Sequence, residues 1–527
     1  MIVPLHNYAH YVTEALDSVA AQTAADLDLV VVDDCSTDAG LQVVHKWMEA
    51  NASRFRKALL LRHSVNSGLA ATRNTAFGRC ETEFVLPLDA DNQLYPTCLQ
   101  KLTDSLASTP AAFAYCILER FGDGDAAAPF LMNFYPWCPE DLFKANTIDA
   151  MALLRRTIWE DAGGYTAGMP CTGWEDYDFW FKIARLGARG LHVPQILARY
   201  RVHPTSMLNT ITNRGENPQS LTIHLRSTYP EFFGDTDPDG GSAGDPRGAS
   251  FEPAATPQIP GAGDLIDAID PCDEMFTGDT GHYFRTGRSA LDAITAALRT
   301  VGRDTCRSIL DLPCGHGRVM RHLRAAFPDA MITACDLNRD AVDYCVRTFD
   351  AAGVYADRSV GDTVVAGSFD LIWCGSLLTH LPRPLWGDLL SWFARRLTPD
   401  GVLVFTTHGQ LSADWIRRGT HTYGIAAGDL PGLLDSYTGT GFGYVPYPGG
   451  APDYGISLSS AQWVLEQVRQ QPGLGVVLVK EKGWDNHQDV YACVTADGAR
   501  FSDAQKRDSA GMSAENSTNP PIRFPYE

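Results

Sequence analysis

The chain has 527 residues, of which 45% are hydrophobic and 20% are charged. This composition is typical of globular proteins and excludes a largely disordered chain, and the length predicts two or three domains. Acidic residues outnumber basic ones, 63 to 43, which gives a formal charge of −20. Because such a chain repels phosphate backbones, we expect no nucleic-acid partner.

No apolar run reaches the roughly 20 residues that a membrane-spanning helix needs, so we expect no transmembrane segment. The N-terminus lacks the basic stretch followed by an apolar stretch that marks a secretory signal. The 13 cysteines are scattered and form no CxxC pair, which favours free thiols over disulfides or a zinc site. These features predict a cytoplasmic protein and leave its oligomeric state open.

One segment divides the chain. Residues 234–263 are rich in Gly, Pro, Asp, Ala and Ser and contain only two bulky hydrophobic residues. Such a segment buries too little surface to offset its ordering entropy, so we expect a flexible linker. It separates two expected domains, residues 1–233 and 264–498, which should fold separately without a fixed relative orientation. Residues 499–527 are expected to form a polar C-terminal tail.

Short β-branched runs alternate with amphipathic helices on both sides of the linker. The alternation predicts an α/β fold class with parallel sheets, and ligands bind such sheets at the carboxyl ends of strands. In the first domain we expect a strand at the very start of the chain, helices over 11–22 and 39–51, and strands over 27–33, 58–61 and 83–88. In the second we expect strands over 308–312, 331–336, 369–374 and 402–407, closed by an antiparallel pair at 475–479 and 490–494.

Polar residues follow the expected strands of the first domain. The acidic cluster that includes Asp34 can accept a hydrogen bond from a base or a ribose hydroxyl, or it can cap the next helix. Residues 66–74 (NSGLAATRN) form a glycine turn that leads into a helix bearing Arg73, which suits a diphosphate. Asp89 and Asp91 can hold a divalent cation, although such a pair is more often a solvated turn.

Two later motifs carry further candidate groups. Residues 173–180 (GWEDYDFW) place carboxylates among aromatic rings, where desolvation can keep a carboxyl pKa within a working range. The same acidic residues can instead mark a helix start, where the helix dipole favours them. His203 is a candidate ligand of a metal or diphosphate, and a lone histidine is more often structural.

The ordered set VVDDCSTD, NSGLAATRN, LDADN, GWEDYDFW and RVHPTSM resembles the family 2 glycosyltransferases of the GT-A fold, over about residues 1–210. The resemblance implies inverting transfer of a sugar from a UDP- or other nucleoside diphosphate sugar to a glycan or glycoconjugate acceptor, with Mg or Mn as the divalent metal. It also implies that Asp176 is the general base, with Glu175 beside it, and that Asp91 and His203 bind the metal.

The same resemblance assigns the nucleotide-sugar contacts, which are Pro4, His6, Asp34, Asn66, Arg73 and Asp89. His6 stands where the family often has a tyrosine or similar ring. The chain also begins inside what should be the first strand, so either that strand is short or the true start lies upstream.

In the second domain, residues 308–318 read SILDLPCGHGR. Asp311 ends a strand, and Gly315 and Gly317 form a turn that lets a ligand approach the backbone closely. Asp336 ends the next strand, where a carboxylate can take both hydroxyls of an adenosine ribose. A nicotinamide-binding Rossmann domain has a similar turn and is the alternative.

This region resembles the class I S-adenosylmethionine-dependent methyltransferases, with their Rossmann-like fold, over about residues 275–495. The resemblance implies that Asp311, Gly315, Gly317 and Asp336 bind S-adenosylmethionine and that Asp362 contacts the adenine. His380, which follows the strand over 369–374, is a candidate base for an acceptor hydroxyl, and a packing role is at least equally compatible. His408 is a second candidate.

The chain is therefore expected to be a bifunctional enzyme, with a GT-A nucleotide-sugar-binding domain followed by a methyltransferase domain that acts on a sugar hydroxyl. The alternative is an active glycosyltransferase whose second domain is a cofactor-binding scaffold or methylates a non-glycan substrate.

Overall fold

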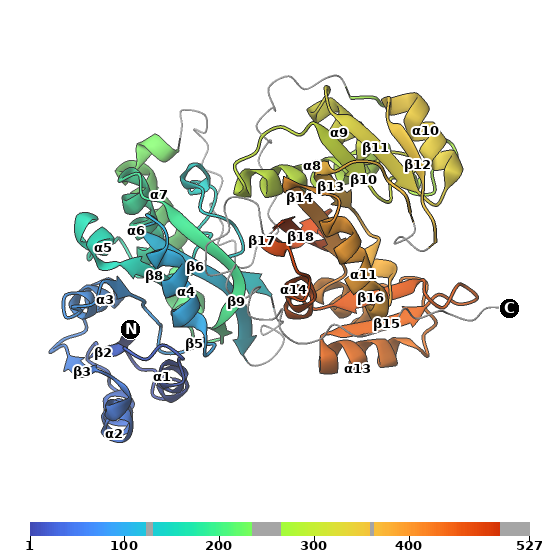
Figure 1. Cartoon of the computed structure of the whole chain (residues 1–527). Coiled ribbons are helices and arrows are strands. Elements are labelled where there is room, and N and C mark those ends of the chain that lie inside the picture. Colours follow the sequence, from blue (N-terminus) through green and yellow to red (C-terminus); the bar gives the residue numbers. More distant parts are fainter. Residues whose placement is uncertain (123–129, 234–264, 359–362, 496–527) are drawn as a thin grey trace.

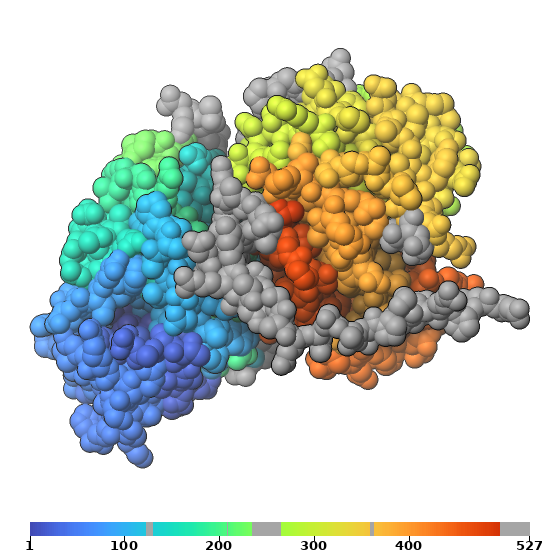
Figure 2. All heavy atoms as spheres, viewed as in Figure 1, coloured from blue at the N-terminus to red at the C-terminus, as the bar shows by residue number. Residues whose placement is uncertain are grey.

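The computed structural model describes residues 1–122, 130–233, 265–358 and 363–495. They form two α/β bodies, which confirms the expected fold class (Figure 1). In the space-filling view the first body, blue to green, lies beside the second, yellow to red (Figure 2). The expected linker and C-terminal tail lie outside the described residues.

The first body starts with three strands that pair in parallel in the order β1-β2-β3. Every residue of β2 is buried, as the Leu-Val-Val-Val run within it predicts for a strand covered on both faces. Helix α3 packs against β1 and β2, and α1 packs against α2. The elements are β1 (Ile2–Leu5), α1 (Val12–Ala20), β2 (Asp28–Asp33), α2 (Gly40–Asn51), β3 (Lys57–Arg62) and α3 (Leu69–Phe77).

A mixed sheet with the strand order β4-β8-β6-β9-β5 completes the first body, and β7 pairs with β6. Of the predicted strand over 83–88, Phe84–Val85 form β4, and the chain then pairs in parallel with β1, since the Ile2 N–H donates to the Leu86 carbonyl and the Leu88 N–H donates to the Ile2 carbonyl. The loop that carries Asp89 and Asp91 follows directly. The sheet comprises β4 (Phe84–Val85), β5 (Gln93–Leu94), β6 (Phe113–Gly122), β7 (Leu131–Met132), β8 (Ala152–Arg155) and β9 (Gly190–Val202). Its helices are α4 (Cys98–Ala107), α5 (Arg156–Asp161), α6 (Glu175–Arg185) and α7 (Asn217–Thr228).

The second body is built on a seven-stranded sheet in the order β12-β11-β10-β13-β14-β18-β17. Its first five strands are parallel, and β18 and β17 form the expected antiparallel pair. The strands are β10 (Ser308–Asp311), β11 (Met331–Asp336), β12 (Ala352–Tyr355), β13 (Phe369–Cys374), β14 (Leu397–Thr407), β17 (Leu474–Trp484) and β18 (Gln488–Thr495). The helices are α8 (Thr280–Thr300), α9 (Met320–Ala326), α10 (Arg339–Phe349), the 3-10 turn η7 (Leu378–His380) and α11 (Arg383–Ala394).

A further unit, which the sequence patterns did not predict, lies between β14 and β17. Its strands β15 and β16 pair as an antiparallel hairpin beside α13 (Figure 1). A small core that includes Ile416, Leu433 and Ile456 holds the unit together. Its elements are α12 (Gln410–Arg417), α13 (Leu430–Thr440), β15 (Phe442–Pro446), β16 (Gly455–Ser459) and α14 (Ala461–Arg469).

The two bodies pack against each other where β9 meets β17. Ile117 and Leu131 of the first body belong to the same buried cluster as residues of the second. The Leu131 N–H donates a hydrogen bond to the Glu481 carboxylate (2.6 Å), and the Lys482 ammonium lies 4.2 Å from the centre of the Phe130 ring. The expectation that the bodies need no fixed orientation is thus not met in the structure, which joins them by apolar and polar contacts.

Within the described ranges, no helix is both long enough and apolar enough to cross a membrane. All 13 cysteines are free thiols, as their spacing predicts.

Candidate active sites

The loop after β4 and the end of β9 bring Asp91 and His203 together. They lie 112 positions apart, and the His203 Nε2–H donates to Asp91 Oδ2 at 3.1 Å. Both side chains are largely buried. Burial raises the pKa of the Asp91 carboxyl, and the hydrogen bond from His203 opposes that shift.

Arg201 lies on β9 and holds Asp91 and His203 in this arrangement. The sequence motifs assigned no role to this residue. Its Nε donates to the Asp91 carbonyl (2.9 Å), and its backbone N–H donates to the Asn92 side chain (2.8 Å). The arginine thereby holds the loop after β4 against the strand that carries His203. Only its place two residues before that histidine hinted at such a role.

The donor set at Asp91 and His203 fits a divalent cation. A carboxylate oxygen and an imidazole nitrogen are ordinary ligands of Mn²⁺, and Mg²⁺ commonly binds one or two carboxylates with phosphates and water. Among the residues that the structure describes, no group of three or more His, Cys, Asp or Glu side chains could hold a metal ion. A cation here would therefore take its remaining ligands from a bound diphosphate and from water.

Arg73 lies on α3 with 1% of its surface exposed and links two acidic motifs. Its Nη2 donates to Asp89 Oδ1 (2.7 Å) and its Nη1 to Glu175 Oε1 (3.0 Å). Burial alone would lower the pKa of Arg73, but these two carboxylates raise it above its ordinary value. The diphosphate contact expected of Arg73 stays a prediction, and in the structure its guanidinium engages two carboxylates.

The carboxylates of the GWEDYDFW motif have different surroundings at the start of α6. Burial raises the pKa of Glu175, while its Arg73 partner opposes the shift. Asp176 accepts from the Asn146 side chain (3.1 Å) and has no arginine partner among the described ion pairs. Asp178 accepts from the hydroxyls of Tyr229 (2.7 Å) and Thr166 (2.5 Å), so it serves packing.

Three of the predicted nucleotide-sugar contacts form one cluster. The His6 Nδ1–H donates to the Asp34 carbonyl (2.8 Å), and the Asn66 amide donates to His6 Nε2 (3.1 Å). The Asp34 carboxylate accepts from the backbone N–H groups of Ser67 and Gly68, each at 2.8 Å. Asp34 therefore shapes the glycine turn. Pro4 is buried within β1.

In the second body, the glycine turn after β10 is tied to the end of β11. Asp336 accepts from the backbone N–H of Gly315 (2.8 Å) and from that of Asn338 (2.9 Å). Gly315 and Gly317 have positive φ angles of 47° and 79°, which favour glycine. A Cβ on Gly317 would lie 2.2 Å from the Phe349 ring, whereas one on Gly315 would meet nothing within 4 Å. The backbone at Gly315 is thus open to a ligand.

Asp311, which ends β10, is 1% exposed, and neither of its carboxylate oxygens has a hydrogen-bond partner in the described chain. Burial, with a smaller effect of Asp336, raises the pKa of Asp311 well above its ordinary value. A buried, unpaired carboxyl is costly, so it favours a ligand that carries a donor or a positive charge. S-adenosylmethionine carries an ammonium and a sulfonium, so the residues present fit it. Asp362, the predicted adenine contact, lies outside the described residues.

The family model of Glycosyl transferase family 2 matches residues 1–168, and that of a methyltransferase domain matches residues 309–401. The chain carries a family 2 glycosyltransferase domain followed by a methyltransferase domain. The two matched segments contain most of the site residues described above, and His203 and the carboxylates at the start of α6 lie beyond the first of them.

Relatives match only part of the chain. An uncharacterized glycosyltransferase of Rickettsia felis is 25% identical over 232 residues, which are 41% of this chain and 36% of the relative. The poly(ribitol-phosphate) beta-N-acetylglucosaminyltransferase TarS of Staphylococcus aureus is 40% identical over 96 residues, 18% of this chain and 16% of TarS. The crystal structure of TarS 1–349 with UDP-GlcNAc has a TM-score of 0.36 and 21% identity, covering 43% of this chain and 65% of that one. The chain thus spans about a third or less of the length of these two curated relatives.

In the methyltransferase domain, His380 lies just after β13, and its hydrogen bond indicates which ring nitrogen carries the proton. Its Nδ1–H donates to the Gly455 carbonyl (2.9 Å), because a carbonyl can only accept. Burial lowers the pKa of His380, so the ring is neutral and Nε2 is its proton acceptor. His408, the second candidate, is buried after β14, with its ring centre 6.5 Å from that of His380.

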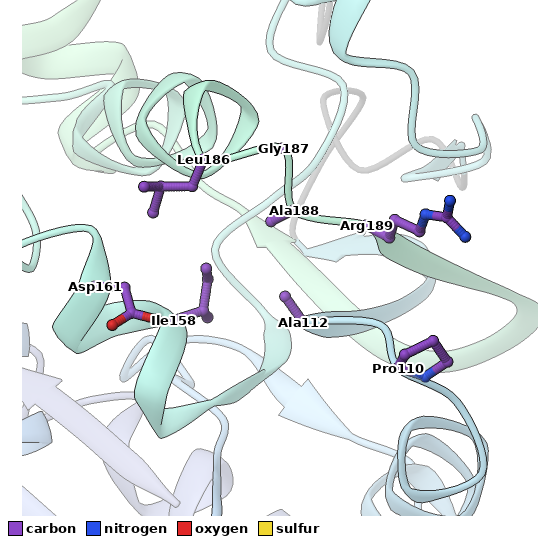
Figure 3. A pocket seen from close by; sticks show the side chains of 8 residues that line it. All are labelled: Pro110, Ala112, Ile158, Asp161, Leu186, Gly187, Ala188 and Arg189. Atoms are coloured by element: carbon purple, nitrogen blue, oxygen red, sulfur yellow. The ribbon is translucent and has the colours of Figure 1, made fainter.

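A surface hollow in the glycosyltransferase domain lies apart from these residues. It is lined by the ends of α5 and α6 and the start of β6, including Ile158, Asp161, Leu186 and Arg189 (Figure 3). None of the predicted site residues lines it.

Proposed function

We propose that the chain is a bifunctional enzyme. Its first domain, residues 1–233, transfers a sugar from a nucleoside diphosphate sugar to a glycan or glycoconjugate with inversion and with a divalent metal. Its second domain, residues 264–498, transfers a methyl group from S-adenosylmethionine to a sugar hydroxyl.

The main support for sugar transfer is that acidic motifs far apart in the sequence lie together in the folded first domain. Arg73 binds Asp89 and Glu175, and Asp91 pairs with His203. Carboxylates brought together at the cost of desolvation are typical of functional sites. When bound, a divalent cation held by Asp91 and His203 would neutralise charge on the diphosphate.

Of the two carboxylates at the start of α6, Asp176 suits the general base better. Glu175 is held by Arg73, so taking a proton there would weaken a buried ion pair. Asp176 is bound by neutral donors, the Asn146 amide and a backbone N–H. It would take the proton of the acceptor hydroxyl as that oxygen attacks the sugar carbon from the face opposite the diphosphate.

For methyl transfer, the domain needs chiefly to hold and orient two molecules, because S-adenosylmethionine supplies an already activated methyl group. Gly315 offers its open backbone, Asp336 would accept from ribose hydroxyls, and Asp311 would accept from the ammonium group. The acceptor oxygen would take the methyl carbon as the bond from that carbon to sulfur breaks. The hydroxyl proton passes to His380 Nε2.

A pair of measurements on the full chain tests these proposals. Nucleotide sugars are screened for hydrolysis with Mg²⁺, with Mn²⁺ and with a chelator, an assay that needs no acceptor. S-adenosylmethionine is titrated by calorimetry. We expect hydrolysis of at least one nucleotide sugar that the chelator abolishes, and saturable binding of S-adenosylmethionine. Hydrolysis that survives the chelator would refute the metal requirement, and a flat titration would refute methyl transfer.

A further inference from the structure

Aromatic and imidazole rings gather beside His380 in the methyltransferase domain. They come from separate segments: α12 and the loop after it, the end of β14, the 3-10 turn after β13, and the turn between β17 and β18. These rings form what we call the ring cluster, defined as Trp415, His421, Tyr423, His487, His408 and His380.

His487 lies at the centre of the ring cluster. Its ring stacks on Trp415 at 4.8 Å between centres and on His408 at 5.1 Å. The ring of Tyr423 lies 5.8 Å away and within 16° of parallel, and its hydroxyl lies 2.7 Å from His487 Nε2. Exposure falls from one end to the other, because His421 is exposed and His408 is 3% exposed. The cluster therefore leads from the exposed His421 inward to His408, and the half-buried His380 lies beside it.

The ring cluster carries little charge. Burial, with a smaller effect of His421, lowers the pKa of His487 to about 4, and burial lowers the pKa of His408 well below its ordinary value. A metal does not explain the imidazoles, since among the described side chains no three are placed to hold one. Neutral rings with polar edges offer apolar faces for stacking together with donors and acceptors at their rims.

The inner end of the cluster lies beside the cofactor residues. Tyr454, from the segment between β15 and β16, has its ring centre 5.0 Å from that of His380. His380 and His408 follow β13 and β14, which run parallel to β10, so they lie at the same edge of the sheet as Asp311 and the Gly315 turn. A ligand on the ring cluster would thus lie next to the group that gives up its methyl.

One polar atom of the cluster lacks a partner. His408 Nδ1 is buried and makes no hydrogen bond in the described chain. Buried polar atoms are rarely left unpaired, and exceptions are often functional. A cluster that served packing alone would gain stability from an apolar ring at this position, so the unpaired nitrogen favours a binding role.

We propose that the ring cluster is the methyl-acceptor site and that it binds an uncharged sugar ring. This inference rests on the proposed methyl transfer and assigns its acceptor site. A sugar ring has an apolar C–H face, which suits Trp415 and the imidazole faces, and hydroxyl edges, which suit Tyr423, His408 and His487. An anionic sugar would find no lysine or arginine within the ring cluster to offset the loss of its hydration.

The test uses the full chain with radiolabelled S-adenosylmethionine and a panel of acceptors. The panel holds methyl glycosides of neutral hexoses and N-acetylhexosamines, with methyl glucuronide and catechol for comparison. We expect methylation of a neutral glycoside. Trp415→Ala and Tyr423→Leu should raise its KM roughly two- to tenfold, the size of one lost stacking contact, while the Kd for S-adenosylmethionine stays unchanged.

Two variants control for damage to the fold. Tyr423→Phe keeps the stacking ring and loses only the hydroxyl, so its KM should rise less than that of Tyr423→Leu. His45→Gln alters an exposed histidine on α2 of the other domain and should change neither constant.

Preferred methylation of glucuronide or catechol, or an unchanged KM in Trp415→Ala and Tyr423→Leu, would overturn the inference. So would a chain that binds S-adenosylmethionine, methylates no neutral glycoside, and shows no protection of His487 from diethyl pyrocarbonate by those glycosides. If the unsubstituted chain binds no S-adenosylmethionine, the proposed methyl transfer itself fails, and this inference fails with it.

Discussion

Arg73 and Glu175 lie 102 positions apart and share a buried hydrogen-bonded ion pair of 3.0 Å. The other end of the same guanidinium binds Asp89, so one arginine connects the loop after β4 to the start of α6. Those two segments carry the proposed metal ligand Asp91 and the proposed base Asp176. The relative position of the two groups therefore depends on a side chain that need not touch substrate.

We predict that Arg73→Met destabilises the glycosyltransferase domain by about 3 to 5 kcal/mol, because it leaves two carboxylates without their cation. Denaturant unfolding followed by circular dichroism measures the change. Arg73→Lys should restore only part of the loss, since an ammonium cannot reproduce two hydrogen bonds in the guanidinium geometry. Lys57→Met, which removes a cation from the exposed pair with Glu81, is the control and should change stability far less. Equal stability of Arg73→Met and the unsubstituted chain would contradict the structural role.

A second prediction separates the neighbouring carboxylates. Asp176→Asn should lower the rate of sugar transfer by roughly 10²- to 10⁴-fold, the usual contribution of a general base, with nucleotide-sugar binding close to normal. The kcat and KM of transfer and the Kd of the nucleotide sugar are measured together. Glu175→Gln is the matched variant. It should lower stability more than Asp176→Asn does, because it removes the carboxylate that pairs with Arg73. If Glu175→Gln is the inactive variant and Asp176→Asn stays active, the base has been assigned to the wrong carboxylate.

Sugar transfer should depend on a divalent cation, and binding of that cation should require both Asp91 and His203. We expect Asp91→Ala to lose sugar transfer by orders of magnitude, because the diphosphate gains charge as it leaves and the cation would be held less firmly. Transfer is measured across a series of Mn²⁺ concentrations, with and without chelator. S-adenosylmethionine binding by Asp91→Ala, measured by calorimetry, should stay normal and so report an intact chain. Full transfer by Asp91→Ala in the presence of chelator would disprove the metal site.

The sequence indicated which residues belong to the candidate site. It did not indicate which groups those residues contact in the folded chain. The end of a predicted strand pointed to Asp91, and the ordered family motifs pointed to His203. The carboxylate partners of Arg73 could not be predicted from the sequence. A guanidinium binds a diphosphate and a carboxylate equally well, and only the fold shows which groups lie beside it. The apolar run over 83–88 indicated an extended segment, but it could not reveal that its first half pairs with β8 and its second half with β1.

The ring cluster in the methyltransferase domain is a second case in which the sequence did not reveal contacts between distant residues. His380 could be singled out because it follows a predicted strand. Trp415 and Tyr423 sit in a helix and a loop without any motif, and His487 lies in the turn between β17 and β18. Residues that meet only through tertiary packing leave no periodic signal in the sequence.

S-adenosylmethionine binding should depend on Asp336. Asp336→Ala is expected to weaken binding roughly ten- to a hundredfold, as for the loss of hydrogen bonds to a charged group, and it also frees the Gly315 turn. Asp336→Asn, which keeps the side-chain size, should weaken binding less. Calorimetry on the full chain gives both constants, and Asp388→Ala on the exposed side of α11 is the control. Unchanged binding in Asp336→Ala would exclude this carboxylate as the ribose acceptor.

The contact between the two domains should weaken as the pH rises. Glu481 accepts a hydrogen bond from the Leu131 N–H across that contact, and desolvation there, with the neighbouring Asp489 carboxylate, raises the pKa of Glu481 to about 8. The pKa of Asp489 is itself raised by burial, to about 7. Because the folded chain holds these protons more tightly than the unfolded chain, stability is greatest at the low pH where both states are protonated. Stability then falls as the pH rises towards the raised pKa values, since the unfolded chain has lost protons that the folded chain still holds.

We therefore predict that the thermal midpoint of the full chain falls between about pH 5 and pH 8, and that the midpoint of Glu481→Gln falls less over the same range. The glutamine keeps an oxygen that accepts from Leu131 and has no proton to lose, so the carboxylate charge is removed without removing the contact. Differential scanning calorimetry across that range gives the difference between the two proteins, which cancels groups common to both. Glu466→Gln, in an exposed pair with Arg469, is the matched control and should follow the unsubstituted chain. Equal pH profiles for Glu481→Gln and the unsubstituted chain would show that Glu481 titrates as an ordinary surface carboxyl.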